Sequence, residues 1–193
     1  MSPISPKSVC LRNKPPMKLL TEQLIVALRS GQPLDDPLRC LVVATNARAA
    51  GCWRLHNGHL ELLGFGVAAD MDTAVDRGFR DTTRRVPLDQ LGLGIVKAAV
   101  TGQPAIGRRD PSDNGLDGSA TWIARFEAQT SLAVPIRLMN SNEVAGVLAV
   151  STADIVHPEH PLWSLLVELA DRLAESCEQP ALADTANDRR QAQ

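Results

Sequence analysis

The sequence predicts an α+β domain built around an antiparallel sheet. Two apolar runs rich in Val, Ile and Leu flank a polar cluster at 140–142, and together they indicate a β-hairpin over 131–152. Neither face of the second run is polar, so we expect this hairpin in the middle of the sheet, covered on both sides. Apolar residues recur at helical spacing over 17–30 and 162–177, which indicates an amphipathic helix at each end of the domain.

Length and composition indicate one globular domain. The chain has 193 residues, enough for a single domain with its own core, and 44% of them are hydrophobic. We place the domain at 17–178, after a flexible, Pro-containing lead at 1–16 and before a polar, disordered tail at 179–193. Aromatic residues make up only 3% of the chain and Tyr is absent, so the three Trp and three Phe residues are the candidates for pocket walls.

Charge and hydropathy exclude several classes of partner. With 20 basic and 22 acidic residues, the formal net charge of -2 gives no overall attraction to nucleic acid or to an anionic membrane. No apolar run approaches the roughly 18 residues that a membrane-spanning helix needs, and the first residues lack the apolar segment of a signal peptide. We therefore expect a cytoplasmic protein with no nucleic-acid or membrane partner.

The first half of the domain is predicted to hold two helices and a hairpin. Asp36 is a suitable N-cap for the second helix. The dipeptide Asn57-Gly58 is a strong signal for a two-residue hairpin turn. The expected elements are helices at 17–30 and 36–50 and strands at 51–55 and 59–67.

The middle of the chain is predicted to hold short helices around a polar loop. A Gly-x-Gly turn at 92–94 precedes one helix, but Lys97 stands where a third glycine belongs and no long parallel strand comes before it, which excludes a dinucleotide-binding motif. The loop at 108–118 is rich in Gly, Asp and Asn, and we interpret it as a mobile lid. The expected elements are helices at 70–80, 92–101 and 121–129 and a strand at 82–88.

Four arginines lie close together in the sequence at Arg77, Arg80, Arg84 and Arg85. They form either a solvated basic face or a site where one or two guanidinium groups bind an anion, because the guanidinium fork suits carboxylate and phosphate. Arg80, next to Phe79, is the candidate anion ligand.

The cysteines and histidines form no metal-binding pattern. The four cysteines are widely spaced and contain no C-x-x-C motif. His56 and His59 flank the hairpin turn without a third ligand nearby, and prolines interrupt the turn that carries His157 and His160. We expect no metal site.

Two segments resemble the GAF domain family. SLAVPI, followed by a turn and VAGVLAV, is similar to the family's terminal hairpin, and GLGIVKAAVTGQPAI at 92–106 is similar to its middle helix and the following strand. Their order and spacing match, as does the long helix after them, so the resemblance covers 17–177. It implies a GAF-like, PAS-related antiparallel sheet of five or six strands, with terminal helices on one face and short pocket helices on the other.

The resemblance also implies a ligand pocket under the short helices. Mapped onto this sequence, its wall holds Phe79, Trp122 and Phe126, and Trp53 reaches in if the first strand has the required register. Arg80 would add an anion ligand. Each aromatic residue fits a plain core position as well.

Differences from the better-known subfamilies reduce the number of ligand classes that the domain could bind. The pocket segments, 70–129, contain neither the cysteine that holds a bilin nor the cysteines used by members that resemble free methionine-R-sulfoxide reductase. The Asn-Lys part of the cyclic-nucleotide pattern is absent, and all four histidines lie outside the pocket, so neither a covalent bilin nor haem is expected. The ligand itself stays unidentified.

We therefore expect a non-catalytic sensory or regulatory domain that binds a small molecule. It would signal in trans, through helix-mediated contacts in a homodimer or with a protein partner that carries the output. Two alternatives stay open: a thiol-dependent reductase that relies on Cys52, and a ligand-free dimerisation scaffold. Alkylation of the native protein distinguishes the reductase from the other two functions, because a catalytic thiol is reactive and a structural thiol is inert.

Overall fold

The computed structural model describes residues 16–110 and 116–178. The expected lead at 1–16, apart from its last residue, and the expected tail at 179–193 lie outside the described residues, as does the centre of the expected lid at 108–118. In chain order the elements are α1 (Met17–Arg29), α2 (Asp35–Thr45), β1 (Ala49–His56), β2 (His59–Val67), α3 (Thr73–Thr83), β3 (Arg85–Pro87), α4 (Gly94–Thr101), β4 (Ala105–Arg108), α5 (Asp117–Arg125), β5 (Thr130–Arg137), β6 (Val144–Thr152) and α6 (Pro161–Glu178).

The strands form one antiparallel sheet in the order β3-β2-β1-β6-β5-β4, which confirms the predicted α+β class. The hairpin predicted at 131–152 is formed by β5 and β6, and it is central because β6 also pairs with β1. Pro135 is tolerated in β5 because the ladder from β4 ends opposite Ala133. Within residues 16–110 and 116–178, none of the helices combines the length and the apolar character needed to span a membrane.

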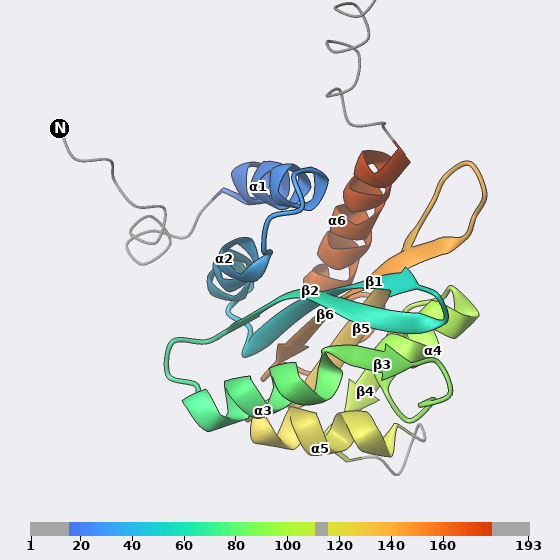
Figure 1. Cartoon of the computed structure of the whole chain (residues 1–193). Helices are drawn as coiled ribbons and strands as arrows, with labels where there is room; N and C mark the ends of the chain where they lie inside the picture. Colours follow the sequence, from blue (N-terminus) through green and yellow to red (C-terminus); the bar gives the residue numbers. More distant parts are fainter. Residues whose placement is uncertain (1–15, 111–115, 179–193) are drawn as a thin grey trace, which may run out of the picture.

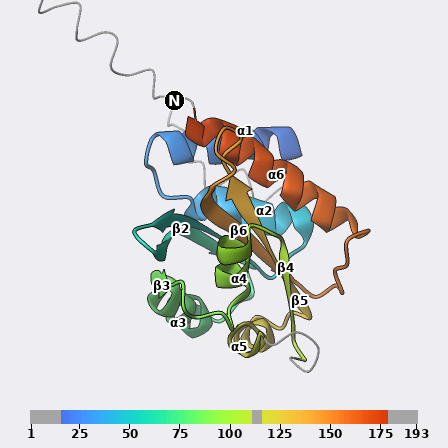
Figure 2. The ribbon, with the colours of Figure 1, turned by 90° about the vertical axis from the view of Figure 1, so that its right-hand side faces the viewer.

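Helices cover both faces of the sheet (Figures 1 and 2). α1, α2 and α6 lie on one face, and α3, α4 and α5 lie on the other. The first group buries a core that includes Leu24 and Leu166, which we call the terminal-helix core. The second group buries a separate core that includes Val96 and Ile123, which we call the pocket-side core. The expected division between terminal helices and short pocket helices is confirmed.

A β-bulge in β2 decides which side chains reach each core. Cys52 pairs with Gly64 and Trp53 pairs with Leu62, so Leu63 is an extra residue between the two pairs. The bulge reverses the alternation of side chains, and residue 65 therefore reaches the pocket-side core together with Leu62. The bulged strand presents its two glycines, at 64 and 66, to α2.

Those two glycines let α2 lie with its backbone directly on β2. A Cβ atom on Gly66 would come within 2.4 Å of the Arg39 backbone nitrogen, and one on Gly64 within 2.7 Å of the Leu34 Cβ atom. Real Cβ atoms essentially never come this close to other heavy atoms. The Leu34 N–H also donates a hydrogen bond to the Leu63 carbonyl at 3.3 Å, which fixes the start of α2 on the bulge.

The second helix spans 35–45 and not the predicted 36–50, and the residue at its N-cap is Leu34, so the prediction of Asp36 as N-cap was wrong. It ends at Thr45 because Asn46 adopts a left-handed backbone with a φ of 53°. The Ala47 N–H then donates to the Val42 carbonyl at 2.9 Å and closes the helix. Residues 49 and 50, predicted as helix, belong to β1 instead.

Among the other predicted boundaries, those of α3, β3 and α5 differ most from the structure. α3 begins after Asp72 and not at residue 70, because the Asp72 carboxylate accepts a hydrogen bond from the Ala74 N–H at 2.7 Å. The strand predicted at 82–88 is reduced to the three residues of β3, since α3 continues to Thr83. The helix predicted at 121–129 lies at 117–125, and Glu127, with a φ of 56°, separates it from β5.

Candidate functional site

Five of the six aromatic side chains of the chain gather in the pocket-side core. Phe79 lies at the centre of the group: its ring centroid is 4.4 Å from that of Phe65 and 5.0 Å from those of Trp122 and Phe126. Trp53 meets Phe79 edge to face at 6.2 Å. The sixth aromatic residue, Trp163, packs against the other core. Most of the few aromatic residues in this chain therefore lie together in the pocket-side core.

The five rings surround a small cavity between the sheet and the helices α3, α4 and α5. Four of them are the residues that the sequence analysis named as pocket wall: Trp53, Phe79, Trp122 and Phe126. The cavity has a volume of about 40 Å³, which is enough for about two or three water molecules.

Phe65 is the wall residue that sequence analysis missed. Strict alternation from Leu60 and Leu62 places residue 65 on the opposite face of the sheet, and the bulge at Leu63 reverses that assignment. The run Gly64-Phe65-Gly66 is the one signal in the sequence, because glycines beside a lone aromatic residue in a strand often mark a bulge or a close backbone approach.

Four residues with hydroxyl groups also line the cavity. Ser131 and Ser151 face each other across β5 and β6 and both line it. Ser119, on α5, also lines it, and its Oγ accepts a hydrogen bond from the Gly94 N–H at the start of α4 at 2.8 Å. Thr83 completes the group, with its hydroxyl donating to the Phe79 carbonyl at 2.8 Å.

The cavity lining carries no titratable side chain among the described residues. Aromatic rings, small apolar residues and hydroxyl groups provide its surface. A charged ligand buried here would lose its hydration without gaining a counter-ion, which costs several kcal/mol or more. The lining therefore suits a neutral, largely apolar molecule with a polar edge.

Trp53 is the most firmly held part of the wall. Its indole N–H donates to the Thr83 carbonyl at 3.1 Å, so the only polar atom of the side chain is satisfied within the core. Gly51, two residues earlier on β1, leaves the space that the indole occupies, since a Cβ atom there would come within 2.4 Å of the ring. The first strand thus has the register that brings Trp53 into the cavity wall.

Arg48 joins two of the segments that enclose the cavity. Its guanidinium contacts both carboxylate oxygens of Asp70, at 2.8 and 3.0 Å, and donates to the Phe126 carbonyl at 3.0 Å. The hydrogen bond from Arg48 lowers the pKa of the Asp70 carboxyl group. No local pattern in the sequence marks Arg48, because its partners come from distant segments. Its contacts fix the approach to α3 relative to the end of α5.

Comparison with known proteins identifies the fold. No protein-family model and no curated protein matches the sequence. Among solved structures, the GAF domain region of a putative membrane protein from Geobacter sulfurreducens superposes with a TM-score of 0.56 at 16% identity, covering 83% of this chain and 97% of that one. The chain has the GAF-domain fold.

Other structures with the GAF fold have different activities. A phycocyanobilin-bound GAF domain from a cyanobacterial phytochrome matches at a TM-score of 0.56 and 10% identity, covering 84% of this chain and 94% of that one. A type II free methionine-R-sulfoxide reductase from Thermoplasma acidophilum matches at 0.50 and 18%, covering 81% and 94%. At these identities the GAF fold is shared, and function has to be argued from the site itself.

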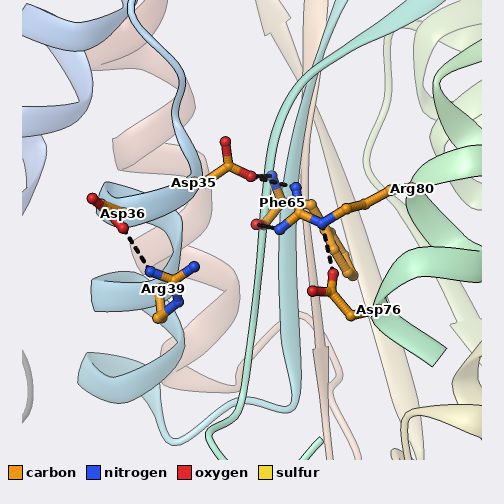
Figure 3. Close-up of polar contacts among 6 residues, drawn as sticks. All are labelled: Asp35, Asp36, Arg39, Phe65, Asp76 and Arg80. Carbon is orange, nitrogen blue, oxygen red and sulfur yellow. Dashed lines mark hydrogen bonds and ion pairs between the residues drawn. The ribbon is translucent and has the colours of Figure 1, made fainter. Parts of the chain in front are cut away.

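Within the GAF fold, Arg80 is not among the residues that line the cavity, and Figure 3 shows its bonds to protein groups. Its guanidinium donates to the carboxylates of Asp35 and Asp76, the latter at 2.7 Å, and to the Phe65 carbonyl. Burial lowers the pKa of the guanidinium, and the bonds to the two aspartates raise it by more. Protein carboxylates thus occupy the position where the sequence analysis expected an anionic ligand. The contacts of this side chain are structural, joining α3 to β2 and α2.

Cys52 lies on the face of the GAF sheet that is opposite the aromatic cavity. Its side chain belongs to the terminal-helix core and does not line the cavity. Burial, together with the thiol of Cys177, raises the pKa of Cys52 to about 12, so the nucleophilic thiolate is scarce at neutral pH. Neither its position nor its protonation state supports the alternative of a reductase that uses Cys52 in the pocket.

Proposed function

We propose that the chain is a non-catalytic sensory or regulatory domain that binds a neutral small molecule in the aromatic cavity. The observation that carries the proposal is the lining of that cavity, which combines five aromatic residues with four serine and threonine residues. Clefts of this composition orient a ligand with a few polar contacts and gain affinity from apolar burial.

Binding requires the wall to open. Because the cavity has room for only about two or three waters, a ligand of metabolite size must displace a ring. Trp122 is the least buried of the five aromatic residues, and it lies between α3 and α5, where it contacts Phe79 edge to face. We propose that Trp122 and Phe79 swing outward to admit the ligand.

Ligand binding in the cavity would also change the surface through which the domain signals. A shift of Phe79 moves α3, and the bonds of Arg80 extend from α3 to Asp35 at the start of α2. Occupancy would thus change the packing of the terminal helices, which contact a second copy of the chain or a protein partner in the cytoplasm. This is population shift: the ligand favours the arrangement that binds it better.

The decisive experiment combines native mass spectrometry with tryptophan fluorescence. Native spectra of freshly purified protein reveal any retained molecule. Benzamide and cyclohexanecarboxamide are then titrated against their charged counterparts, benzoate and cyclohexanecarboxylate, none of which masks tryptophan emission. We expect the neutral probes to change the emission of Trp53 and Trp122 and to bind about 100-fold or more tightly than the anions, because no lining residue compensates a buried charge.

A substitution that fills the cavity tests the site, and the same substitution at a nearby exposed position provides the matched control. Ala149 lines the cavity, and Ala149→Val extends methyl groups into it, so we expect affinity for the neutral probes to fall about tenfold or more. Ala153→Val, at an exposed position just beyond the same strand, should leave affinity unchanged. Equal binding of charged and neutral probes, or insensitivity to Ala149→Val, would rule out this site.

The small volume of the cavity favours one competing function, a dimerisation scaffold whose pocket is closed. Native mass spectra distinguish the two functions. A dimer without an adduct, combined with no fluorescence response to any of the four probes, would support the scaffold and reject the sensor.

A further inference from the structure

A second cavity lies on the other face of the sheet, at the end of α6. It has a volume of about 410 Å³, and both Cys52 and Cys177 line it, together with Leu28, Leu63 and Ile136. This cavity and the aromatic cavity have one lining residue in common, Trp53. Its strand, β1, borders both cavities because they lie on opposite faces of the sheet.

The two cysteines approach this cavity from different elements. Cys52 lies on β1 with 1% of its surface exposed, and it faces the terminal-helix core. Cys177 lies in the last turn of α6 and is exposed to solvent. The two thiols are close enough for a charge on Cys177 to raise the pKa of Cys52. An accessible thiol and a buried thiol therefore share one space, although 125 positions (177 minus 52) separate them in the sequence.

We propose that Cys52 and Cys177 form an oxidant-sensitive pair, in which a hydroperoxide converts the two thiols to a disulfide that locks α6 onto β1. Cys177 meets the oxidant first because its thiol is exposed, and Cys52 is the resolving thiol, protected from the oxidant by burial. Neither residue takes part in the aromatic cavity, so the pair is a separate site.

The chemistry balances with a hydroperoxide as the sole oxidant. The Cys177 sulfur attacks the peroxide, the O–O bond breaks, and hydrogen peroxide leaves one water and a sulfenic acid on Cys177. The Cys52 thiol then gives its proton to the hydroxyl group on Cys177 as its sulfur attacks the Cys177 sulfur, so the step needs no standing thiolate on Cys52; the S–O bond breaks and a second water leaves. Two electrons pass from the thiols to the peroxide.

The disulfide constrains the terminal-helix layer. It holds the two Cβ atoms at about 3.8 Å and so fixes the last turn of α6 against β1. The same turn already contacts α1, where the Arg29 side chain donates to the Ser176 carbonyl at 3.4 Å. Oxidation therefore fixes the position of α6 relative to both α1 and the sheet, in the layer that carries the proposed output.

Tryptic peptide mapping tests the pair directly, since all four cysteines fall on different peptides. Cys52 lies on 49–54 and Cys177 on 173–189. After treatment with hydrogen peroxide we expect these two peptides joined, with the loss of two hydrogen masses and release by dithiothreitol. We also expect the melting temperature to rise by roughly 5–10 °C, because the new bond closes a long loop.

Cys177→Ser is the matched control, because the position is exposed and the change leaves the core intact. The variant should show neither the joined peptide nor the rise in melting temperature. The proposal is overturned if oxidised wild-type protein carries Cys177 as a sulfinic acid or as a disulfide between two chains, while Cys52 is still alkylated after unfolding.

Discussion

Burial gives the Cys52 thiol a higher pKa than an exposed cysteine has. Desolvation in the terminal-helix core, and secondly the thiol of Cys177, raises its pKa from 9.0 to about 12. Between those two values the folded chain keeps a proton that the unfolded chain has lost. By linkage, a group with a raised pKa in the folded state contributes stability that is complete below pH 9 and is lost as pH rises toward 12.

This shift predicts a pH-dependent difference between wild type and Cys52→Ala. Above pH 9 the unfolding free energy of the wild type should fall more steeply than that of the variant, by about 1.4 kcal/mol per pH unit. Urea unfolding at several values between pH 8 and 11, under reducing conditions, measures the slopes. Comparing slopes removes the constant cost of the smaller side chain. Parallel slopes would contradict a raised pKa for this thiol.

At the scale of the element, β2 shows how far the sequence predicts the structure. Its hairpin with β1 was predictable because Asn57-Gly58 is a local signal. The wall position of Phe65 was not, because a one-residue bulge at Leu63 reverses which side chains face the pocket. The end of α2 had a local signal in Asn46, which a helical interpretation up to residue 50 overlooked.

Two glycines, Gly66 in β2 and Gly78 in α3, predict opposite effects of the same change to alanine. Gly66→Ala places a Cβ atom 2.4 Å from the Arg39 backbone nitrogen, so α2 must move, and we expect a loss of about 1–3 kcal/mol. Gly78→Ala in α3 meets only the Trp122 ring at 3.8 Å, an ordinary contact, and should gain about 0.5–1 kcal/mol. Urea unfolding measures both. The same sign for the two changes would refute the close packing of α2 on β2.

At the scale of the whole molecule, Arg80 connects the two helix layers around the sheet. Its guanidinium bonds to Asp76 on its own helix α3, to Asp35 on α2 and to the Phe65 carbonyl of β2, as Figure 3 shows. The sequence indicated that Arg80 was unusual, but its partner Asp35 is distant in the chain, so no local pattern could distinguish a protein carboxylate from a ligand. The four pocket aromatic residues were predictable for a different reason, since a chain with six aromatic residues offers few candidates.

The connection predicts a measurable coupling between layers. Arg80→Met should lower the unfolding free energy by about 1–2 kcal/mol, a value reduced from that of a buried pair because about a third of each side chain is exposed. In a double-mutant cycle with Asp35→Asn we expect a coupling of about 1 kcal/mol. Arg77→Met, at an exposed position of the same helix, should change stability by less than about 0.5 kcal/mol. Additive effects of the Arg80 and Asp35 changes would mean that the layers are not linked here.

The central pairing of β1 with β6 has a consequence during synthesis. A ribosome completes β1 and its hairpin partner β2 early, but the second neighbour of β1 begins only at Val144. Until that strand emerges, one edge of β1 is unpaired while its residues from Ala49 to Trp53 carry side chains that the finished fold buries. Such an edge is a template for pairing with another chain, so the nascent protein is most exposed to aggregation just before its last strand is made.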